Sequence, residues 1–203
     1  MYTEMIRNPV TGETLYVLES TSEVFRVEFA IEPGASMGEE HLHPNQQKSI
    51  RVTQGALGIS SAGKNAVLQE GETVVVPPRE PHFQWNPTRE TAWAIEEIRP
   101  SGKAHAYFRV AFALARDGMT DSRGVPPPLI GAAMMDEFGS FARPTSTRLR
   151  VLFKLLNPIS RFLGYGKLIR EYIERTDIEG GRHPIVVQAA INFGDLEERR
   201  ILA

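Results

Sequence analysis

The chain of 203 residues contains no cysteine. This absence excludes disulfides, thiolate metal sites and cysteine nucleophiles, and it suits a reducing compartment. We therefore expect a cytoplasmic protein in which any metal site depends on histidine. Five histidines are present in the sequence.

A surplus of positive charge is also absent, because 23 lysines and arginines stand against 25 aspartates and glutamates. Without an overall basic field to collect phosphates, we expect no nucleic-acid partner. No segment is long and apolar enough to span a bilayer, and the first nine residues lack the apolar core of a signal peptide. The hydrophobic content of 41% is enough to build a real core in a chain of this length.

Short strands separated by turn residues fill the first hundred residues. Residues 24–31 show the period of two most clearly, since Phe25, Val27, Phe29 and Ile31 occupy alternate positions. Many short strands with glycine and proline between them indicate an all-β sandwich or barrel. The other predicted strands are residues 14–18, 37–43, 48–53, 56–60, 66–69, 73–76, 82–85 and 91–98.

After about residue 101 the periodicity becomes helical. Residues 105–116 carry apolar side chains at helical spacing and end at Asp117-Gly118, which predicts a helix. Three consecutive prolines at 126–128 favour a stiff connector, and a second helix is expected over residues 129–138. We therefore expect a mainly β domain at residues 1–104, followed by a helical C-terminal region at residues 105–203.

The most amphipathic segment is residues 147–163. It has an apolar face and a basic face, and Pro158 is expected to kink or split the helix. A basic amphipathic helix can lie on an anionic membrane, but a helix that packs on a domain shows the same pattern. We expect packing and no membrane partner, and docking to a partner or a membrane stays the alternative. The apolar face consists of Leu149, Leu152, Phe153, Leu156, Ile159 and Leu163.

Three of the histidines have a spacing that suits one metal ion. His41 and His43 are two residues apart, so in a strand both side chains leave the same face. Lys48 has the parity of the apolar positions of its own strand, which points it inward toward this pair. His82 follows a proline-rich turn, and a rolled sheet would bring it opposite the pair. We therefore predict His41, His43 and His82 as metal ligands.

At these positions the sequence resembles the first motif of the cupin superfamily. That motif has a glycine, then His-x-His, then a glutamate and a second glycine. Here the same frame is occupied by Gly34, His41, His43, Lys48 and Gly55.

The second cupin motif is matched more closely. Gly71, Pro77, His82 and Asn86 stand at its positions, and Arg79 replaces its internal glycine. The resemblance covers about residues 8–100. Two motifs in order and at the right separation indicate the fold more strongly than the function, because one fold hosts many activities.

The resemblance implies a double-stranded β-helix, a jelly-roll-like barrel whose mouth holds a metal bound by three histidines and a glutamate. Lys48 stands in the place of that glutamate. Neutral imidazoles suit Fe, Mn, Ni, Cu or Zn, whereas a protonated Lys48 would repel such an ion. The divalent metal is therefore either held by the three histidines or absent, and Gln46 or Gln47 is a further candidate oxygen ligand.

Two hypotheses for the function stay open. The first is a metal-dependent enzyme, a dioxygenase or isomerase, on a small anionic organic substrate that Lys48 orients, neutralises or deprotonates. The second is a metal-free module in which Lys48 replaces the metal-ligand glutamate and an anionic small molecule is bound or sensed. Lys48, Gln46 and Gln84 are the predicted pocket residues in both. The open barrel edges predict a homodimer.

Overall fold

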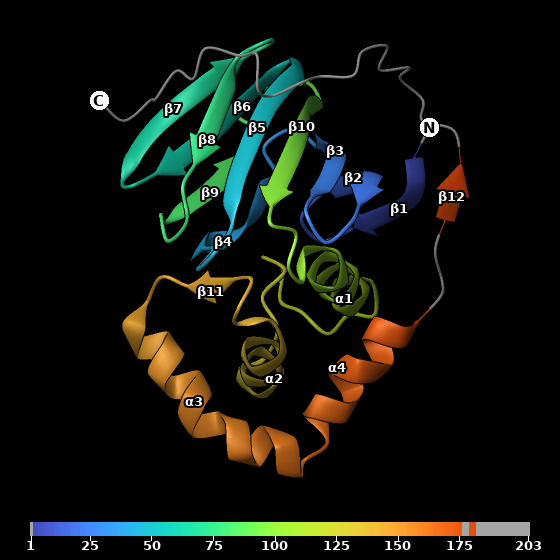
Figure 1. Ribbon diagram of the computed structural model, residues 1–203, viewed down its shortest axis with the longest axis vertical. Helices are drawn as coiled ribbons and strands as arrows, with labels where there is room; N and C mark the ends of the chain where they lie inside the picture. The colour runs from blue at the N-terminus through green and yellow to red at the C-terminus, as the bar shows by residue number, and fades with distance from the viewer. Residues whose placement is uncertain (1, 176–178, 182–203) are drawn as a thin grey trace.

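The structure is a computed structural model that describes residues 2–175 and 179–181. Antiparallel strands form its first part, and the helices gather at one end of these strands (Figure 1). All nine predicted strands are present, and one more precedes them. The strands of the first part are β1 (Tyr2–Asn8), β2 (Glu13–Ser20), β3 (Phe25–Ile31), β4 (Ser36–Leu42), β5 (Gln47–Gln54), β6 (Ala56–Ser61), β7 (Lys64–Gln69), β8 (Thr73–Val76), β9 (His82–Trp85) and β10 (Ala92–Arg99).

The strands pair into two antiparallel sheets. The larger sheet has the order β12-β1-β2-β3-β10-β5-β8, and the smaller has the order β11-β4-β9-β6-β7. Neighbours such as β3 and β10, or β4 and β9, are far apart in sequence, so the chain crosses repeatedly between the sheets. This confirms the predicted mainly β fold, a double-stranded β-helix followed by a helical region.

The hydrophobic core lies between the two sheets. The alternating residues of β3, namely Phe25, Val27, Phe29 and Ile31, are fully buried there. Each apolar side chain of this size stabilises the fold by about 1.5–3 kcal/mol when it leaves water. Because β10 pairs with both β3 and β5, these three strands form a continuous wall that supports the inward-facing polar residues.

Strand β1 was not predicted because polar side chains occupy most of its inward positions. Glu4 and Asn8 are buried beside Ile6, so the apolar alternation is hidden. The Glu4 carboxylate is held by two residues of the following helical region, with His105 Nε2 at 2.6 Å and Arg109 Nε at 3.2 Å. Ion pairs between distant segments therefore complete this strand, and hydrophobic periodicity does not detect them.

The helical region builds a second hydrophobic core and also extends both sheets. Its short strands β11 (Arg143–Pro144) and β12 (Glu179–Gly181) pair with β4 and β1. The division at residue 104 stays a prediction, and residues 176–178 and 182–203 lie outside the described part. None of the described helices has the length and hydropathy needed to cross a membrane. The helices are α1 (Ala104–Arg116), α2 (Pro128–Phe138), α3 (Thr147–Phe162) and α4 (Tyr165–Glu174).

Helix α3 differs from its prediction in two respects. It continues through Pro158, so of the predicted kink or split the split is wrong and the kink stays a prediction; the proline removes one backbone hydrogen bond, and packing of α3 on α2 outweighs this loss. The predicted packing of its apolar face is also wrong in part, because Leu152, Ile159 and Leu163 are 42%, 51% and 55% exposed. The single helix α2 is too narrow to cover so wide a face.

Candidate metal centre

Two neighbouring strands bring the three predicted histidines together. His41 lies on β4, directly across from His82 at the start of β9, and His43 follows the end of β4. The turn before β9 is fixed by Arg79, whose backbone N–H donates to the His43 carbonyl at 2.7 Å. Arg79 has a φ of 69°, a left-handed conformation that glycine adopts most easily. This explains why glycine is the usual residue at this point of the motif.

The three imidazoles form a compact cluster. Their ring centroids are 4.6 to 5.1 Å apart, and one nitrogen of each ring lies within 4.8 Å of the other two. His82 is fully buried, His43 is nearly so, and His41 is the most accessible of the three. The sequence-predicted ligand set is therefore assembled in one place.

Backbone carbonyls fix the orientation of each ring. Nδ1 of His41, His43 and His82 lies 2.9, 2.8 and 2.9 Å from the carbonyl oxygens of Glu39, Phe141 and Glu80. A carbonyl only accepts, so each Nδ1 carries the proton and donates it. Nε2 of each neutral ring then holds a free lone pair. Nε2 of His43 and of His82 is buried and has no hydrogen-bond partner in the described part of the chain.

The environment keeps these rings neutral. Burial lowers the pKa of His41 to about 4, and the positive charge of Lys48 acts in the same direction. Burial, and then the neighbouring His41 and Lys48, hold the pKa of His43 and of His82 well below the usual range. Buried, unpartnered nitrogens on neutral rings are what a divalent metal requires, and hydrogen bonds from Nδ1 are the usual support of histidine ligands. The donor set therefore fits a metal ion.

Lys48 points into the protein, as strand parity predicts, but its charge is not unopposed. Its Nζ lies 2.9 Å from a carboxylate oxygen of Glu96 and donates to Gln84 Oε1, also at 2.9 Å. Lys48 is 2% exposed and Glu96 is 1% exposed, so the ion pair is buried. Lys48 thus joins β5 and β10 of one sheet to β9 of the other. Glu96 pairs with this charge, which still lowers the pKa of the three neighbouring histidines.

Two candidate functional residues, Glu13 and Glu96, were not predicted from the sequence. Glu13 at the start of β2 lines the cavity next to Lys48, and its carboxylate accepts a hydrogen bond from Thr11 Oγ1 at 2.5 Å. Burial raises the pKa of Glu13 to about 7, although the Thr11 hydrogen bond and the Lys48 charge lower it. Parity was the available signal: Glu13 alternates with the buried residues of β2, and Glu96 alternates with Ala94 and Ile98 of β10.

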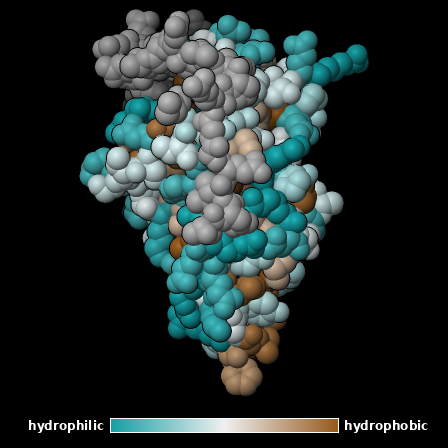
Figure 2. Space-filling view, turned by 90° about the vertical axis from the view of Figure 1, so that its right-hand side faces the viewer, coloured by the Kyte–Doolittle hydropathy of each residue, from teal (hydrophilic) through white to brown (hydrophobic). Residues whose placement is uncertain are grey.

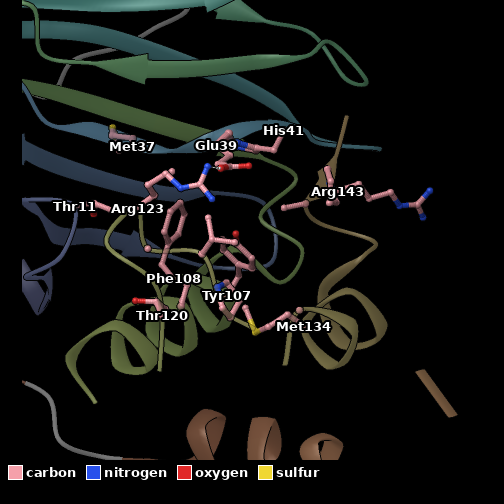
Figure 3. A pocket seen from close by; sticks show the side chains of 18 of the residues that line it. Thr11, Met37, Glu39, His41, Tyr107, Phe108, Thr120, Arg123, Met134 and Arg143 are labelled. Carbon is pink, nitrogen blue, oxygen red and sulfur yellow. Dashed lines mark hydrogen bonds and ion pairs between the residues drawn. The ribbon is translucent and has the colours of Figure 1, made fainter. Parts of the chain in front are cut away.

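A cavity of about 240 Å³ lies between the barrel and the helices, next to the histidine cluster. Tyr107 and Phe108 of α1 face His41 and Glu39 across it, and Arg123 reaches Glu39 with an ion pair of 2.7 Å (Figure 3). The predicted pocket residues Lys48 and Gln84 line this cavity. Gln46 does not; it is buried, and its amide lies against Gly102. Apolar residues of α1, α2, α3 and the turn after α2 that line the cavity include Tyr107, Phe108, Met134, Phe141, Leu149 and Phe153.

Solved structures resemble about half of the chain. No curated protein matches the sequence. Among solved structures, KdgF from Halomonas sp. is 21% identical over 47% of this chain and 84% of its own, with a TM-score of 0.43. An RmlC-like cupin from Shewanella frigidimarina is 24% identical over 50% of this chain and 87% of its own, with a TM-score of 0.45. Identities this low say nothing about activity.

The family comparison covers the segment that contains all three clustered histidines. Residues 27–96 match the family model of the cupin domain. The motif resemblance, the two antiparallel sheets and this match agree with one another. Residues 27–96 of this chain are therefore a cupin domain.

Proposed function

We propose that this protein is a metal-dependent enzyme that acts on a small organic molecule carrying an anionic group. One observation supports the proposal most directly: three neutral imidazoles converge, each locked through Nδ1, and the buried Nε2 atoms of His43 and His82 lack partners. Leaving such buried polar atoms unsatisfied costs about 1–3 kcal/mol each. A bound divalent ion would remove this cost.

His41, His43 and His82 are the residues that would hold the ion, which we expect to be Fe, Mn, Ni, Cu or Zn. When bound, it supplies Lewis acidity or oxygen activation, as in isomerases or dioxygenases. Three neutral ligands leave the charge of a divalent ion uncompensated, so an anionic substrate group is favoured at the open positions. The preference for an anion thus comes from the metal centre rather than from Lys48, which Glu96 already neutralises.

The rest of the cavity suits the body of a small, partly apolar substrate. Its helical wall is mainly aromatic and aliphatic, and such walls bind by burial while a few polar groups fix the orientation.

We assign proton transfer to Glu13, because a pKa of about 7 allows it both to accept and to return a proton near neutral pH. Burial and the Glu13 charge raise the pKa of Tyr107 to about 12, so its hydroxyl stays protonated as a donor.

The alternative function is a metal-free binding or sensing module that grips an anion through Lys48. The buried ion pair with Glu96 and the hydrogen bond to Gln84 count against it, since both already engage the ammonium group. The homodimer and the cytoplasmic location expected from the sequence stay predictions.

The test is metal analysis of the full chain purified without chelator, before and after reconstitution with each of the five metals. We expect about one equivalent per chain in the wild type and a loss of binding in His82→Ala. His105→Ala is the matched control, because His105 lies outside the cluster and pairs with Glu4. Less than about a tenth of an equivalent in the reconstituted wild type would overturn the proposal and favour the metal-free module.

A further inference from the structure

Helix α3 and the turn after it carry a continuous exposed apolar surface. Seven large hydrophobic residues in the described part of the chain are markedly exposed, and Val67 is the only one outside this segment. Phe162 is 90% exposed and Leu155 is 69% exposed. Scattered exposed hydrophobic residues are ordinary, whereas a contiguous patch marks an interaction site. We call this patch the α3 apolar face; it consists of Val151, Leu152, Leu155, Ile159, Phe162 and Leu163.

This face is distinct from the side of α3 that packs on the protein. Phe153 lies against Gly131 of α2, and Ser160 Oγ donates to the Leu129 carbonyl at 2.8 Å. At about 100° per residue, the α3 apolar face spans an arc of about 120° that points away from these contacts. Nothing in the described part of the chain covers it. Helix α3 therefore has one apolar side for its own protein and another that is left for a separate surface.

Positive charge accompanies this apolar surface. Residues 147–170 contain six lysines and arginines and no acidic residue, although the whole chain has a net charge of −2. Arg161 pairs with Asp136, and Lys167 lies 3.5 Å from Glu171. Within the described residues, the remaining cations make no ion pair. They are Arg148, Arg150, Lys154 and Arg170.

The position of α3 and α4 in the molecule is a further argument for an interaction surface. Helices α3 and α4 meet at the narrow end of the molecule, far from the sheets (Figure 1). Apolar side chains gather at that tip in the space-filling view (Figure 2). A projecting apolar tip can insert into a soft planar surface without a preformed groove to receive it.

We infer that the α3–α4 turn anchors this protein to an anionic membrane surface, with the α3 apolar face at the boundary between headgroups and acyl chains. A helix with a large apolar face and a basic edge lies in this plane without spanning the bilayer, and its cations gain from anionic lipids. A second copy of the chain is the less suitable occupant, because two surfaces that carry the same excess of cations repel each other. This inference reverses the expectation from the sequence that no membrane is involved.

The position of the cavity agrees with this anchoring. Leu149 and Phe153 line the cavity from the inner side of α3, while the α3 apolar face lies on the outer side of the same helix. Docking would therefore set one wall of the cavity directly over the lipid. This consequence does not depend on whether a metal is bound.

The test is sedimentation of the full chain with phosphatidylcholine vesicles, prepared with and without phosphatidylglycerol. We expect the wild type to bind the anionic vesicles, and Leu155→Ser/Phe162→Ser to bind them at least about tenfold more weakly. Arg150→Gln/Lys154→Gln should also bind more weakly, as should the wild type when NaCl rises from about 0.1 M to about 1 M. Val67→Ser is the matched control, since it removes an exposed apolar residue outside the α3 apolar face.

Two results would overturn the inference. In the first, the wild-type protein stays in solution with both kinds of vesicle. In the second, the Leu155→Ser/Phe162→Ser variant binds the anionic vesicles as tightly as the wild type does. Analytical ultracentrifugation measures the oligomeric state and so tests a second copy as the occupant. If the wild type is a dimer, the double variant is a monomer and neither binds vesicles, the α3 apolar face belongs to a dimer interface. The mutated side chains are exposed, so a thermal unfolding midpoint close to that of the wild type confirms that each variant is folded.

Discussion

The interior of the barrel and the outer face of α3 depart from the usual pattern of burial in opposite directions. In the barrel, the charged residues Lys48, Glu13 and Glu96 are at most 4% exposed. On α3, Leu155 and Phe162 are 69% and 90% exposed. Buried charge and exposed apolar surface both cost free energy, and neither is needed to form the fold. Such departures are more informative about function than an ordinary core or an ordinary surface.

The two regions differ in whether their requirements are met within the chain. Lys48 has a carboxylate and an amide oxygen as partners, and Glu13 accepts from Thr11. The α3 apolar face meets no partner within the described residues. The charged groups of the barrel interior therefore have partners within the chain, whereas α3 leaves an apolar side uncovered by the described residues.

The largest expected effect comes from breaking the buried ion pair. Lys48→Met keeps most of the side-chain volume but leaves the Glu96 carboxylate buried without its cation. Removing one partner of such a pair costs about 3–5 kcal/mol in the free energy of unfolding. Urea denaturation at pH 8 measures this loss.

The matched double variant Lys48→Met/Glu96→Leu sharpens this prediction. It replaces both charges with apolar groups, and such replacements are often nearly neutral. We therefore expect it to recover most of the lost stability. If the single variant is as stable as the wild type, the buried ion pair between β5 and β10 does not contribute to the stability of the barrel.

A smaller effect, visible only through its pH dependence, is expected for Glu13→Gln. The pKa of Glu13 is about 7 in the folded chain against 4.5 when unperturbed, so between these values the folded state holds more protons. Wild-type stability from this group therefore falls as pH rises from 4.5 to 7. The variant lacks this loss, so its stability relative to wild type should rise by roughly 2 kcal/mol between pH 5 and pH 8.

Urea denaturation of both proteins at these two pH values measures the difference. Glu28 has a pKa raised to about the same value by burial, but it is present in both proteins and cancels. An equal stability difference at pH 5 and pH 8 would mean that Glu13 titrates normally, and would remove its assignment to proton transfer.

The smallest effect is expected on α3. Leu155→Ala should change the free energy of unfolding by less than about 0.5 kcal/mol, because the side chain is already mostly in water. Ile169→Ala on the neighbouring α4 is the control: Ile169 is 1% exposed, and its truncation should cost about 3 kcal/mol. A loss of similar size in both variants would show that the α3 apolar face is covered in solution.

Much of the site was accessible to sequence reasoning because strands have a strict period of two. Parity placed Lys48 inside, and the same rule would have flagged Glu13 and Glu96 as charged residues at inward positions. Their pairing was not predictable, because Glu96 and Lys48 meet only through the register of β10 on β5. The carbonyl of Phe141, which orients His43 from 98 residues away, carries no signal in the sequence at all.

By itself, the sequence determined the strands, their inward faces and the three histidines, because alternation and motif spacing are local properties of the chain. Tertiary structure alone decided what those residues meet. It paired Lys48 with Glu96, set the helical region over the barrel mouth, and limited the contact of α3 to part of its apolar side. The physical reason is that a periodic pattern records which side of an element is apolar, whereas burial and pairing depend on the distant elements that pack against that side.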